Sequence, residues 1–541
     1  MLVHSFPRRH AMALAITLAL ASAGADAATI TVTSTLDGPV TADTTCTLRE
    51  ALASLSAAAN TGGCLATGAY GTADAVNVTA TGTITLDPTQ NALAADVPST
   101  ITGPGAAQLT ISGGNATTVL YAYGPGISLS GVTIANGNSG SPGAGGVDVF
   151  YGSLTLANCT LSGNVGGYGS AALAIYGQLN INNCTITGNT GQIGGAVALL
   201  SSGGNVTSST ISTNTGGAPP PTQRAGHAIW RRADRGHVRV PNLPAGAPGL
   251  GAGISVFGDF GGKGPDAPAG GPQVSITRST ISGNTAQLIG GGVLLYASSA
   301  QVTDSTISGN TAAQAGGGAY VVQSPIVIAN STISGNTATG QGGGGGLLIG
   351  AQAATTAAIQ STTVNGNVAS TAAAGVLIAG PVTATLASSI FANSTGAAPA
   401  DVGTVGQGFA ITATTSLVEN PGNSGITATG GNLVGVDPQL GPLANNGGPT
   451  QTHLPATASP VVNAGANPSG AAFDQRGTPF ARVVGAAADI GSVEVPAGGP
   501  PPTPSFVANV PTTSTWGGML LAGALAALAW LRRPRTARRR R

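Results

Sequence analysis

The octapeptide STISGNTA occupies residues 279–286 and recurs unchanged at residues 305–312 and 331–338, a spacing of 26 residues. Looser copies begin at Cys159, Cys184, Ser209, Thr362 and Ser388. A repeat of about 20 to 50 residues is typical of a solenoid, whereas a propeller blade needs about 40 or more. The spacing therefore predicts a chain wound into stacked coils, with each copy at the same position of its own coil.

The alternation of side chains within each copy indicates a strand that turns one face inward, because strand side chains point to opposite sides every second residue. The expected inward column is apolar and comprises Leu161, Ile186, Ile211, Ile281, Ile307, Ile333, Val364 and Ile390. Two residues earlier, on the same face, we expect a column of small side chains formed by Cys159, Cys184, Ser209, Ser279, Ser305, Ser331, Thr362 and Ser388.

An asparagine ends each copy, usually after a glycine that suits a corner with positive φ. Such asparagines can turn inward and hydrogen-bond to their equivalents in the coils above and below. The predicted ladder comprises Asn164, Asn189, Asn214, Asn284, Asn310, Asn336, Asn367 and Asn393. Ligand binding is the alternative role for such a series, but the regular period favours the ladder.

Two further apolar stretches accompany each copy, one led by glycine as in GGGVLLY from Gly290 and one before the octapeptide as in AQVTD from Ala300. Three short strands per coil of about 25 residues predict an all-β fold, a right-handed parallel β-helix over residues 101–430. The repeats resemble those of polymorphic outer-membrane proteins and other bacterial surface β-helices.

The composition of the 541-residue chain agrees with this fold, with 86 glycines and only 7% charged residues. Long helices are not expected in so glycine-rich a chain. Half of the 18 arginines lie near the two ends, and no basic stripe runs along the body, which argues against nucleic-acid binding. Cys-x-x-Cys pairs are absent as well, so neither a metal nor a cofactor is expected.

The open N-terminal edge of such a stack needs a cover. In CTLREALASLSAAAN, from Cys46, Thr47 and Glu50 fit a capping box before a short amphipathic helix. This stretch, with ITVTSTLD before it, resembles the CSLREA domain, with Thr47 in place of Ser and Leu52 in place of Ile. The resemblance implies an N-terminal cap and first strands over residues 28–100.

Both ends carry targeting signals. Residues 1–27 contain Arg8 and Arg9, an apolar run and Ala25-Asp26-Ala27, the pattern of a signal peptide cleaved by signal peptidase. Residues 496–509 form a proline-rich linker, and residues 510–541 hold an uncharged apolar stretch before terminal arginines, which predicts a C-terminal transmembrane helix.

Two resemblances concern this C-terminal part. Residues 437–467 and 474–494, within a region bounded as 431–495, resemble the choice-of-anchor Q domain. VPTTSTWGG from Val510 resembles the IPTL-CTERM sorting signal of Gram-negative bacteria, with matches at Pro511, Thr512, Trp516 and Gly517. The second resemblance implies membrane anchoring and processing by an exosortase-type protease.

Four cysteines in an exported chain could form two disulfides. Cys159 and Cys184 fall in one column a coil apart, at a separation that a bridge tolerates, and two buried thiols are the equal alternative. Cys46 and Cys64 could tie down the capping helix, although their spacing does not require a bond.

Residues 218–250 depart from the repeat with five arginines, six prolines and two histidines. A basic loop for an acidic partner, a site built on Asp234 with His227 and His237, a disordered insert and a frameshifted coil are the readings considered. The last two are favoured, and translation of the other two reading frames would test the frameshift.

Many β-helices are polysaccharide lyases or hydrolases, which need clustered carboxylates or a Ca²⁺ site with a base. The best enzymatic candidates are Asp259, Lys263 and Asp266 on one glycine- and proline-rich loop, for which a solvated loop is the favoured alternative. Outward threonines form a flat hydroxyl array resembling β-helical ice-binding proteins, and the array could also contact a glycan. They are Thr160, Thr185, Thr210, Thr280, Thr306 and Thr332.

These observations predict an exported β-helix anchored in a Gram-negative cell envelope or at the cell surface, held in the inner membrane by its C-terminal helix for a time or permanently. Its expected role is structural or adhesive, without catalysis, with a glycan or cell-surface ligand as partner. The rival is a carbohydrate-active enzyme centred on Asp259, and an ice-binding protein is a minor alternative.

Overall fold

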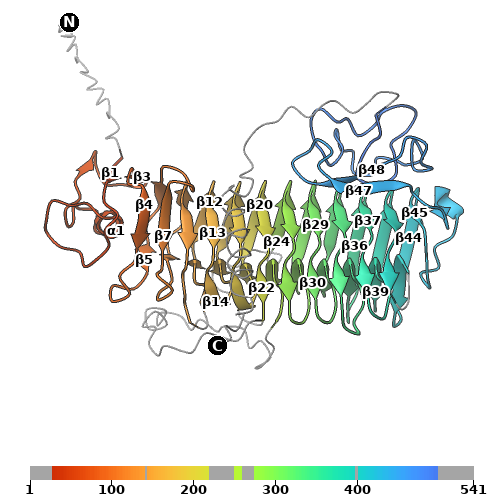
Figure 1. Ribbon diagram of the computed structural model, residues 1–541, viewed down its shortest axis with the longest axis horizontal. Coiled ribbons are helices and arrows are strands. Elements are labelled where there is room, and N and C mark those ends of the chain that lie inside the picture. The colour runs from red at the N-terminus through yellow and green to blue at the C-terminus, as the bar shows by residue number, and fades with distance from the viewer. Residues whose placement is uncertain (1–26, 141–142, 218–248, 259–272, 397–399, 497–541) are drawn as a thin grey trace, which may run out of the picture. The chain divides into compact units, whose positions relative to one another are not determined.

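The computed structural model describes residues 27–140, 143–217, 249–258, 273–396 and 400–496 (Figure 1). These residues form a mostly-β solenoid of about 11 turns. The expected signal peptide, the insert at 218–248, the proline-rich linker from residue 497 and the sorting signal at 510–541 lie outside the described residues. Within the described ranges, no helix is long and apolar enough to cross a bilayer.

Four sheets run along the solenoid, and each coil adds one strand to most of them. In the described part of the chain, neighbouring coils pair in parallel, as Ile281 with Ile307 and Ile307 with Ile333, whereas the edge strand Ala66–Thr67 pairs antiparallel with the first strand, Thr29–Val32. Three rows of strands were expected. The fourth row consists mainly of two-residue strands directly after the asparagine, too short to stand out as an apolar alternation.

Sheet I contains, in spatial order, β2 (Ala66–Thr67), β1 (Thr29–Val32), β3 (Asp74–Val78), β6 (Ser99–Thr102), β9 (Ile127–Ser130), β12 (Ser153–Ala157), β16 (Gln178–Asn182), β20 (Gly203–Thr207), β24 (Gln273–Thr277), β28 (Ser299–Thr303), β32 (Ile326–Ala329), β36 (Thr355–Gln360), β40 (Val382–Ala387) and β44 (Ala410–Thr414). Sheet II contains β4 (Gly82–Thr85), β7 (Leu109–Ser112), β10 (Thr133–Ala135), β13 (Thr160–Ser162), β17 (Thr185–Thr187), β21 (Thr210–Ser212), β25 (Thr280–Ser282), β29 (Thr306–Ser308), β33 (Thr332–Ser334), β37 (Thr363–Asn365), β41 (Ile390–Ala392), β45 (Leu417–Val418) and β46 (Leu433–Val434).

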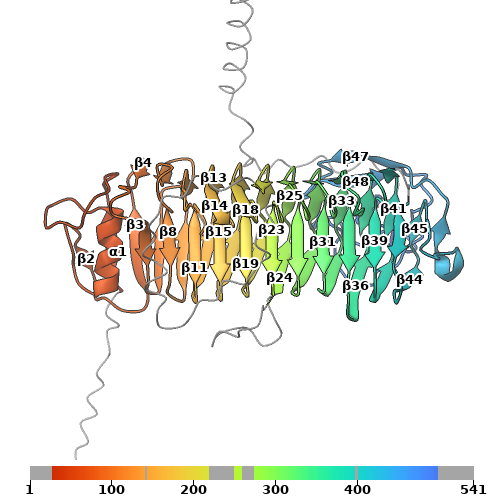
Figure 2. The same cartoon turned by 90° about the horizontal axis from the view of Figure 1, so that it is seen from below.

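Sheet III contains β5 (Leu93–Ala95), β8 (Leu120–Ala122), β11 (Val147–Phe150), β15 (Ala172–Ile175), β19 (Val197–Leu200), β23 (Ile254–Phe257), β27 (Val293–Tyr296), β31 (Ala319–Val322), β35 (Leu347–Gly350), β39 (Val376–Ala379) and β43 (Val402–Val405), and Figure 2 shows many of them side by side. Sheet IV contains β14 (Val165–Tyr168), β18 (Thr190–Ile193), β22 (Thr215–Gly216), β26 (Thr285–Ala286), β30 (Thr311–Ala312), β34 (Thr337–Ala338), β38 (Val368–Ala369) and β42 (Thr395–Gly396).

One apolar core runs through the coils, and the sequence pattern explains it. The inward residue of each octapeptide copy, such as Ile281 or Ile333, is fully buried in a cluster shared by sheets I, II and III. Burying one such side chain contributes about 1.5–3 kcal/mol. The glycine before the ladder asparagine has φ near 60°, as at Gly283 (62°) and Gly335 (63°), where a side chain would be strained.

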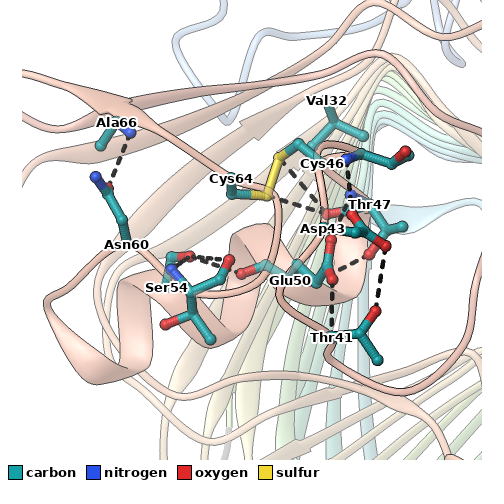
Figure 3. The surroundings of a disulfide bond; sticks show 12 residues. Val32, Thr41, Asp43, Cys46, Thr47, Glu50, Ser54, Asn60, Cys64 and Ala66 are labelled. Carbon is teal, nitrogen blue, oxygen red and sulfur yellow. Dashed lines mark hydrogen bonds between the residues drawn. A yellow bond between two sulfur atoms is a disulfide. The ribbon is translucent and has the colours of Figure 1, made fainter.

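The N-terminal coil is covered by α1 (Leu48–Ala57), at the left of Figure 2. Its capping box is present: the Glu50 N–H donates to Thr47 Oγ1 at 3.2 Å, and the Thr47 N–H donates to Glu50 Oε2 at 3.1 Å. The helix buries Leu48 and Leu52 against the first strands, and a disulfide joins Cys46 to Cys64 beside it (Figure 3). The sequence had left this disulfide open.

The last octapeptide-like copy lies one residue later than predicted. Thr363 pairs with Ile390 and Val364 with Phe391, so Phe391 fills the inward column in place of Ile390. The small column is likewise continued by Ser389, and the predicted Ser388 lies outside it. Two adjacent serines make both alignments of this copy possible from the sequence, and the apolar core selects the one that buries the larger phenylalanine.

The C-terminal segment, defined here as residues 436–496, folds back along the outside of sheet II (Figure 1). It contains the antiparallel pair β47 (Leu440–Ala444) and β48 (Thr452–Pro455). A short 3-10 helix, η2 (Thr429–Gly431), precedes β46 at the end of the stack.

Candidate functional site

Seven of the eight predicted asparagines form a continuous internal ladder. From Asn189 onward, each side-chain oxygen accepts both the backbone N–H and the side-chain N–H of the asparagine one coil earlier, as Asn310 does from Asn284 at 3.0 and 2.9 Å, while Asn164 Oδ1 accepts the Gly137 N–H. Each amide nitrogen also donates to a backbone carbonyl in the preceding coil, as Asn310 to Ile281 at 2.9 Å. The members have no exposed surface, so their role is internal. They are Asn164, Asn189, Asn214, Asn284, Asn310, Asn336 and Asn367.

The prediction for Asn393 is wrong. Asn393 occupies the corner with φ 58° and is exposed, and Ser394 takes the ladder position instead. The Ser394 N–H donates to Asp401 Oδ1 at 2.9 Å, so a carboxylate closes the ladder at this end. The cause is the one-residue shift in register of this copy.

A second internal ladder runs through the column of small residues. The Ser209 N–H donates to Ser279 Oγ at 3.1 Å, and Ser279 N–H to Ser305 Oγ at 3.1 Å. Each hydroxyl in turn donates to the carbonyl two residues earlier, as Ser305 does to Thr303 at 2.7 Å. The repeated small residue thus satisfies backbone groups at each corner.

Cys159 and Cys184 are free buried thiols, so of the two alternatives left open by the sequence, the structure has the thiols and not the disulfide. Both occupy this ladder, and Cys184 Sγ accepts the Cys159 N–H at 3.4 Å as a serine would. Cys184 Sγ also lies 3.2 Å from the Asn182 carbonyl. Because each sulfur points along the column toward the preceding coil, a bond would require one of them to leave its backbone partners.

The outer face of sheet II carries the threonine array, which is open over its N-terminal part. Thr160, Thr210 and Thr280 are partly exposed and Thr185 is exposed. Position for position, β21, β25, β29 and β33 carry the same Thr-Ile-Ser sequence. The open strands therefore present paired hydroxyls at a regular spacing of about 4.8 Å from coil to coil.

The C-terminal part of the same face is covered, which corrects the expectation of an unbroken flat array. Thr306 and Thr332 are fully buried, and the side-chain amide of Gln475 bridges them. Gln475 Nε2 donates to Thr306 Oγ1 at 2.9 Å, and Gln475 Oε1 accepts from Thr332 Oγ1 at 2.6 Å. Thr306 Oγ1 also lies 2.6 Å from the Gln451 carbonyl.

His453 makes the next contact along this covered face. Its Nδ1 lies 2.7 Å from the Gly441 carbonyl and donates to it, which leaves Nε2 as an acceptor for Ser334 Oγ at 2.8 Å and Asn365 Nδ2 at 3.3 Å. Burial lowers the pKa of His453, in agreement with a neutral ring. Farther on, the Ser492 N–H donates to Thr363 Oγ1 at 3.1 Å.

Buried charges hold the C-terminal segment together. Arg476 pairs with Asp474 at 2.6 Å and stacks on Phe480, while Arg482 lies 3.9 Å from Glu494. Glu494 accepts the Val484 and Asp489 N–H groups, yet burial raises its pKa to about 7. These side chains bind one another and backbone groups, which indicates a structural role.

The enzymatic candidates Asp259, Lys263 and Asp266 lie outside the described residues, as do the sorting-signal residues Pro511, Thr512, Trp516 and Gly517. In the part of the chain that the structure describes, no group of three or more His, Cys, Asp or Glu side chains is arranged to hold a metal ion. The candidate site is therefore the outer hydroxyl face of sheet II, open over one part and covered over the other.

Sequence reasoning identified the threonines of this face but missed Gln475 and His453. Both belong to the C-terminal segment, whose polar residues carry no periodic signal. Their partners on sheet II lie 88 to 170 residues away in the chain, so no local pattern connects them.

No family model and no curated protein matches the chain. The crystal structure of pectate lyase Pel9A is similar over 86% of this chain and 97% of that chain, with 12% sequence identity and a TM-score of 0.37. What this chain has in common with that lyase is the β-solenoid fold.

Proposed function

We propose that the protein is an exported, envelope-anchored β-solenoid that acts as a non-catalytic adhesive scaffold, with the open face of sheet II as its contact surface. The strongest support is that open strands (β21 and β25) and covered strands (β29 and β33) of sheet II have the same Thr-Ile-Ser sequence. Where the face is covered, its hydroxyls bind amide, carbonyl and imidazole groups. Where it is open, the same hydroxyls are available to similar groups on a ligand.

Features of the chain outside the site support the proposed location. The Cys46–Cys64 disulfide is typical of an oxidising compartment. The signal-peptide pattern, the CSLREA-like start and the choice-of-anchor Q-like and IPTL-CTERM-like ends all resemble segments of exported proteins. Low charge and internal polar ladders suit a scaffold that has to hold its form without a catalytic centre.

The location is tested on cells that express the full chain. We expect antibody labelling of intact cells, loss of the protein on external protease treatment and a mature N-terminus at Ala28 by mass spectrometry. A chain that keeps residues 1–27 and stays in the cytoplasm would contradict the proposal. Mass spectrometry of the C-terminus tests processing near Pro511.

The adhesive role is tested by substitution on the open face. Replacing Thr185, Thr210 and Thr280 together by valine should reduce attachment of expressing cells to their surface or polymer at least tenfold. Unchanged attachment would remove the open face from the proposal. The rival enzyme is tested with uronate polymers, because turnover abolished by Asp259→Ala would replace adhesion by catalysis. Thermal hysteresis lost in the triple valine variant would favour ice binding.

A further inference from the structure

A second surface lies at the corner where sheet III leads into sheet I, away from the hydroxyl face. Over three successive coils, at the ends of β8, β11 and β15, it gathers Tyr121, Tyr123, Phe150, Tyr151 and Tyr176. The rings of Tyr123 and Phe150 stack with centroids 5.7 Å apart and planes 17° apart, and those of Tyr151 and Tyr176 stack at 5.4 Å and 16°. Tyr121 lies 6.0 Å from Tyr123. We call this group the aromatic corner.

The backbone does not select tyrosine at this corner. Tyr151 and Tyr176 both have φ 52°, in the left-handed region that bulky side chains seldom adopt. At the same place in later coils, the chain has Ser201 (φ 48°) and Ala297 (φ 50°). Tyrosines occupy this strained position in two successive coils. This points to a function for their rings, since such strain concentrates at functional sites.

The aromatic corner combines exposed ring faces with polar groups. Tyr151 is 38% exposed and Tyr123 36%, so ring surface reaches the solvent. Gln178, which starts β16 two residues after Tyr176, is exposed and carries a carboxamide. Burial, together with neighbouring Tyr176, raises the pKa of Tyr151, so its hydroxyl remains a donor at neutral pH.

The charge near these rings disfavours an acidic ligand. Asp148, next to Tyr121 on sheet III, is buried, and burial raises its pKa to about 8, so at neutral pH it is mostly protonated and supplies no positive charge that would attract an acidic ligand. A neutral pyranose has the complementary chemistry, because its C–H face is attracted to the negative face of an aromatic ring while its hydroxyls bond to phenol and amide groups.

We propose that the aromatic corner binds a neutral oligosaccharide, with sugar rings stacked on Tyr151 and Tyr123 and hydroxyls bonded to the tyrosines and Gln178. The two stacked pairs come from neighbouring coils, so the corner takes more than one sugar ring. The inference deepens the proposed function, and it rests on that function only in requiring the protein to meet glycans outside the cytoplasm.

Isothermal titration of the purified full-length chain with cellohexaose, chitohexaose and hexagalacturonate tests the inference. We expect one of the two neutral sugars to bind, hexagalacturonate to bind at least tenfold more weakly, and Tyr151→Ala to weaken neutral binding at least tenfold. Tyr151→Phe should retain binding within about threefold. Tyr296→Ala, at an exposed tyrosine of the same sheet outside the corner, is the matched control and should leave affinity unchanged.

A variant that relieves the backbone separates binding from structure. Tyr151→Gly suits the positive φ and should keep or raise the melting temperature while binding is lost. A purely structural stack predicts the opposite, a lower melting temperature with no effect on any sugar. Tightest binding of hexagalacturonate, or no binding of either neutral sugar, overturns the inference. Because binding is measured on purified protein, failure of export alone would contradict the proposed function and leave this site standing.

Discussion

Thr280 and Thr306 pair with each other in adjacent coils and occupy the same position of identical octapeptides, yet only Thr306 is fully buried. The difference arises because the C-terminal segment covers β29, which holds Thr306, and does not extend over β25, which holds Thr280. A single repeated sequence therefore has two environments within one sheet. This pair of residues allows each environment to be tested against the other.

Thr306→Val should destabilise the protein, and Thr280→Val should not. The first change removes a hydrogen bond to the Gln451 carbonyl and leaves Gln475 Nε2 without one acceptor, at a cost of about 1–3 kcal/mol. The second changes a partly exposed hydroxyl and should remain within about 0.5 kcal/mol. Urea unfolding, with hydrogen exchange across residues 436–496, measures both. If the two substitutions lower the free energy of unfolding equally, the contacts of Thr306 with the C-terminal segment contribute little to stability.

Asn310→Ala should be among the most damaging single changes in the solenoid. It deprives the Asn284 N–H and Nδ2 of their acceptor, and each unsatisfied buried group costs about 1–3 kcal/mol. Asn393→Gly is the control, because Asn393 has positive φ and lies outside the ladder, so stability should be kept or slightly raised. The two free energies of unfolding are compared in urea. A loss at Asn393 as large as at Asn310 would argue that the ladder extends to it.

The four cysteines should separate into two classes. Cys46→Ser opens the Cys46–Cys64 bond, which spans 18 residues, and should lower stability by about 2–4 kcal/mol. Cys184→Ser should stay within about 1 kcal/mol, because serine already fills this column at Ser209. Thermal melts measure both effects. Thiol titration should find two reactive groups only after unfolding without reductant, and none at all would mean that Cys159 and Cys184 are bonded.

Asp148 predicts a pH dependence of stability. Burial raises its pKa to about 8, although the Ala144 N–H bond acts in the opposite direction. A carboxyl with a raised pKa favours folding in its protonated form, so the stabilisation is complete below about pH 4 and is lost as pH rises through 8. Asp148→Asn keeps an acceptor for Ala144 without the charge. The free energy of unfolding of this variant should be higher than that of the parent protein by about a few kcal/mol at pH 9, which is the order of magnitude that such a pKa shift implies. The two free energies should become equal near pH 4.

Unfolding free energies of both proteins between pH 4 and 9 check this expectation. Tyr121, packed beside Asp148, remains protonated throughout because burial raises its pKa. Parallel curves for the two proteins would show that Asp148 is ionised in the fold at neutral pH.

Most of the fold could be predicted from the repeat. Ile281 and Asn284 could be placed inward because each recurs at a fixed interval, and a periodic column has one consistent packing. The last copy failed at Ser388, because adjacent serines leave the register to be decided by the volume of Phe391 in the core. The cover over Thr306 could not be foreseen, since a buried and an open threonine have the same neighbours in sequence.

The aromatic corner also has a regular spacing in the sequence. Tyr151 and Tyr176 each precede a glycine and lie 25 residues apart, the same interval as the octapeptide-like copies around them. The positive φ at this corner could not be foreseen from tyrosine, which seldom adopts it. Backbone geometry was needed to recognise the spacing as a pair of stacked rings.

The asparagine ladder makes each coil an interchangeable module, because its bonds need only the asparagine and the backbone of an adjacent coil. A duplicated coil can enter the gene without new chemistry in the interior, and the three identical octapeptides have the form that such duplication leaves. Coils added before Ser305 lengthen the solenoid. Loss of coils between Ser305 and Ile390 removes the surface on which residues 436–496 pack. Natural length variation among such chains should therefore concentrate on the N-terminal side of that boundary.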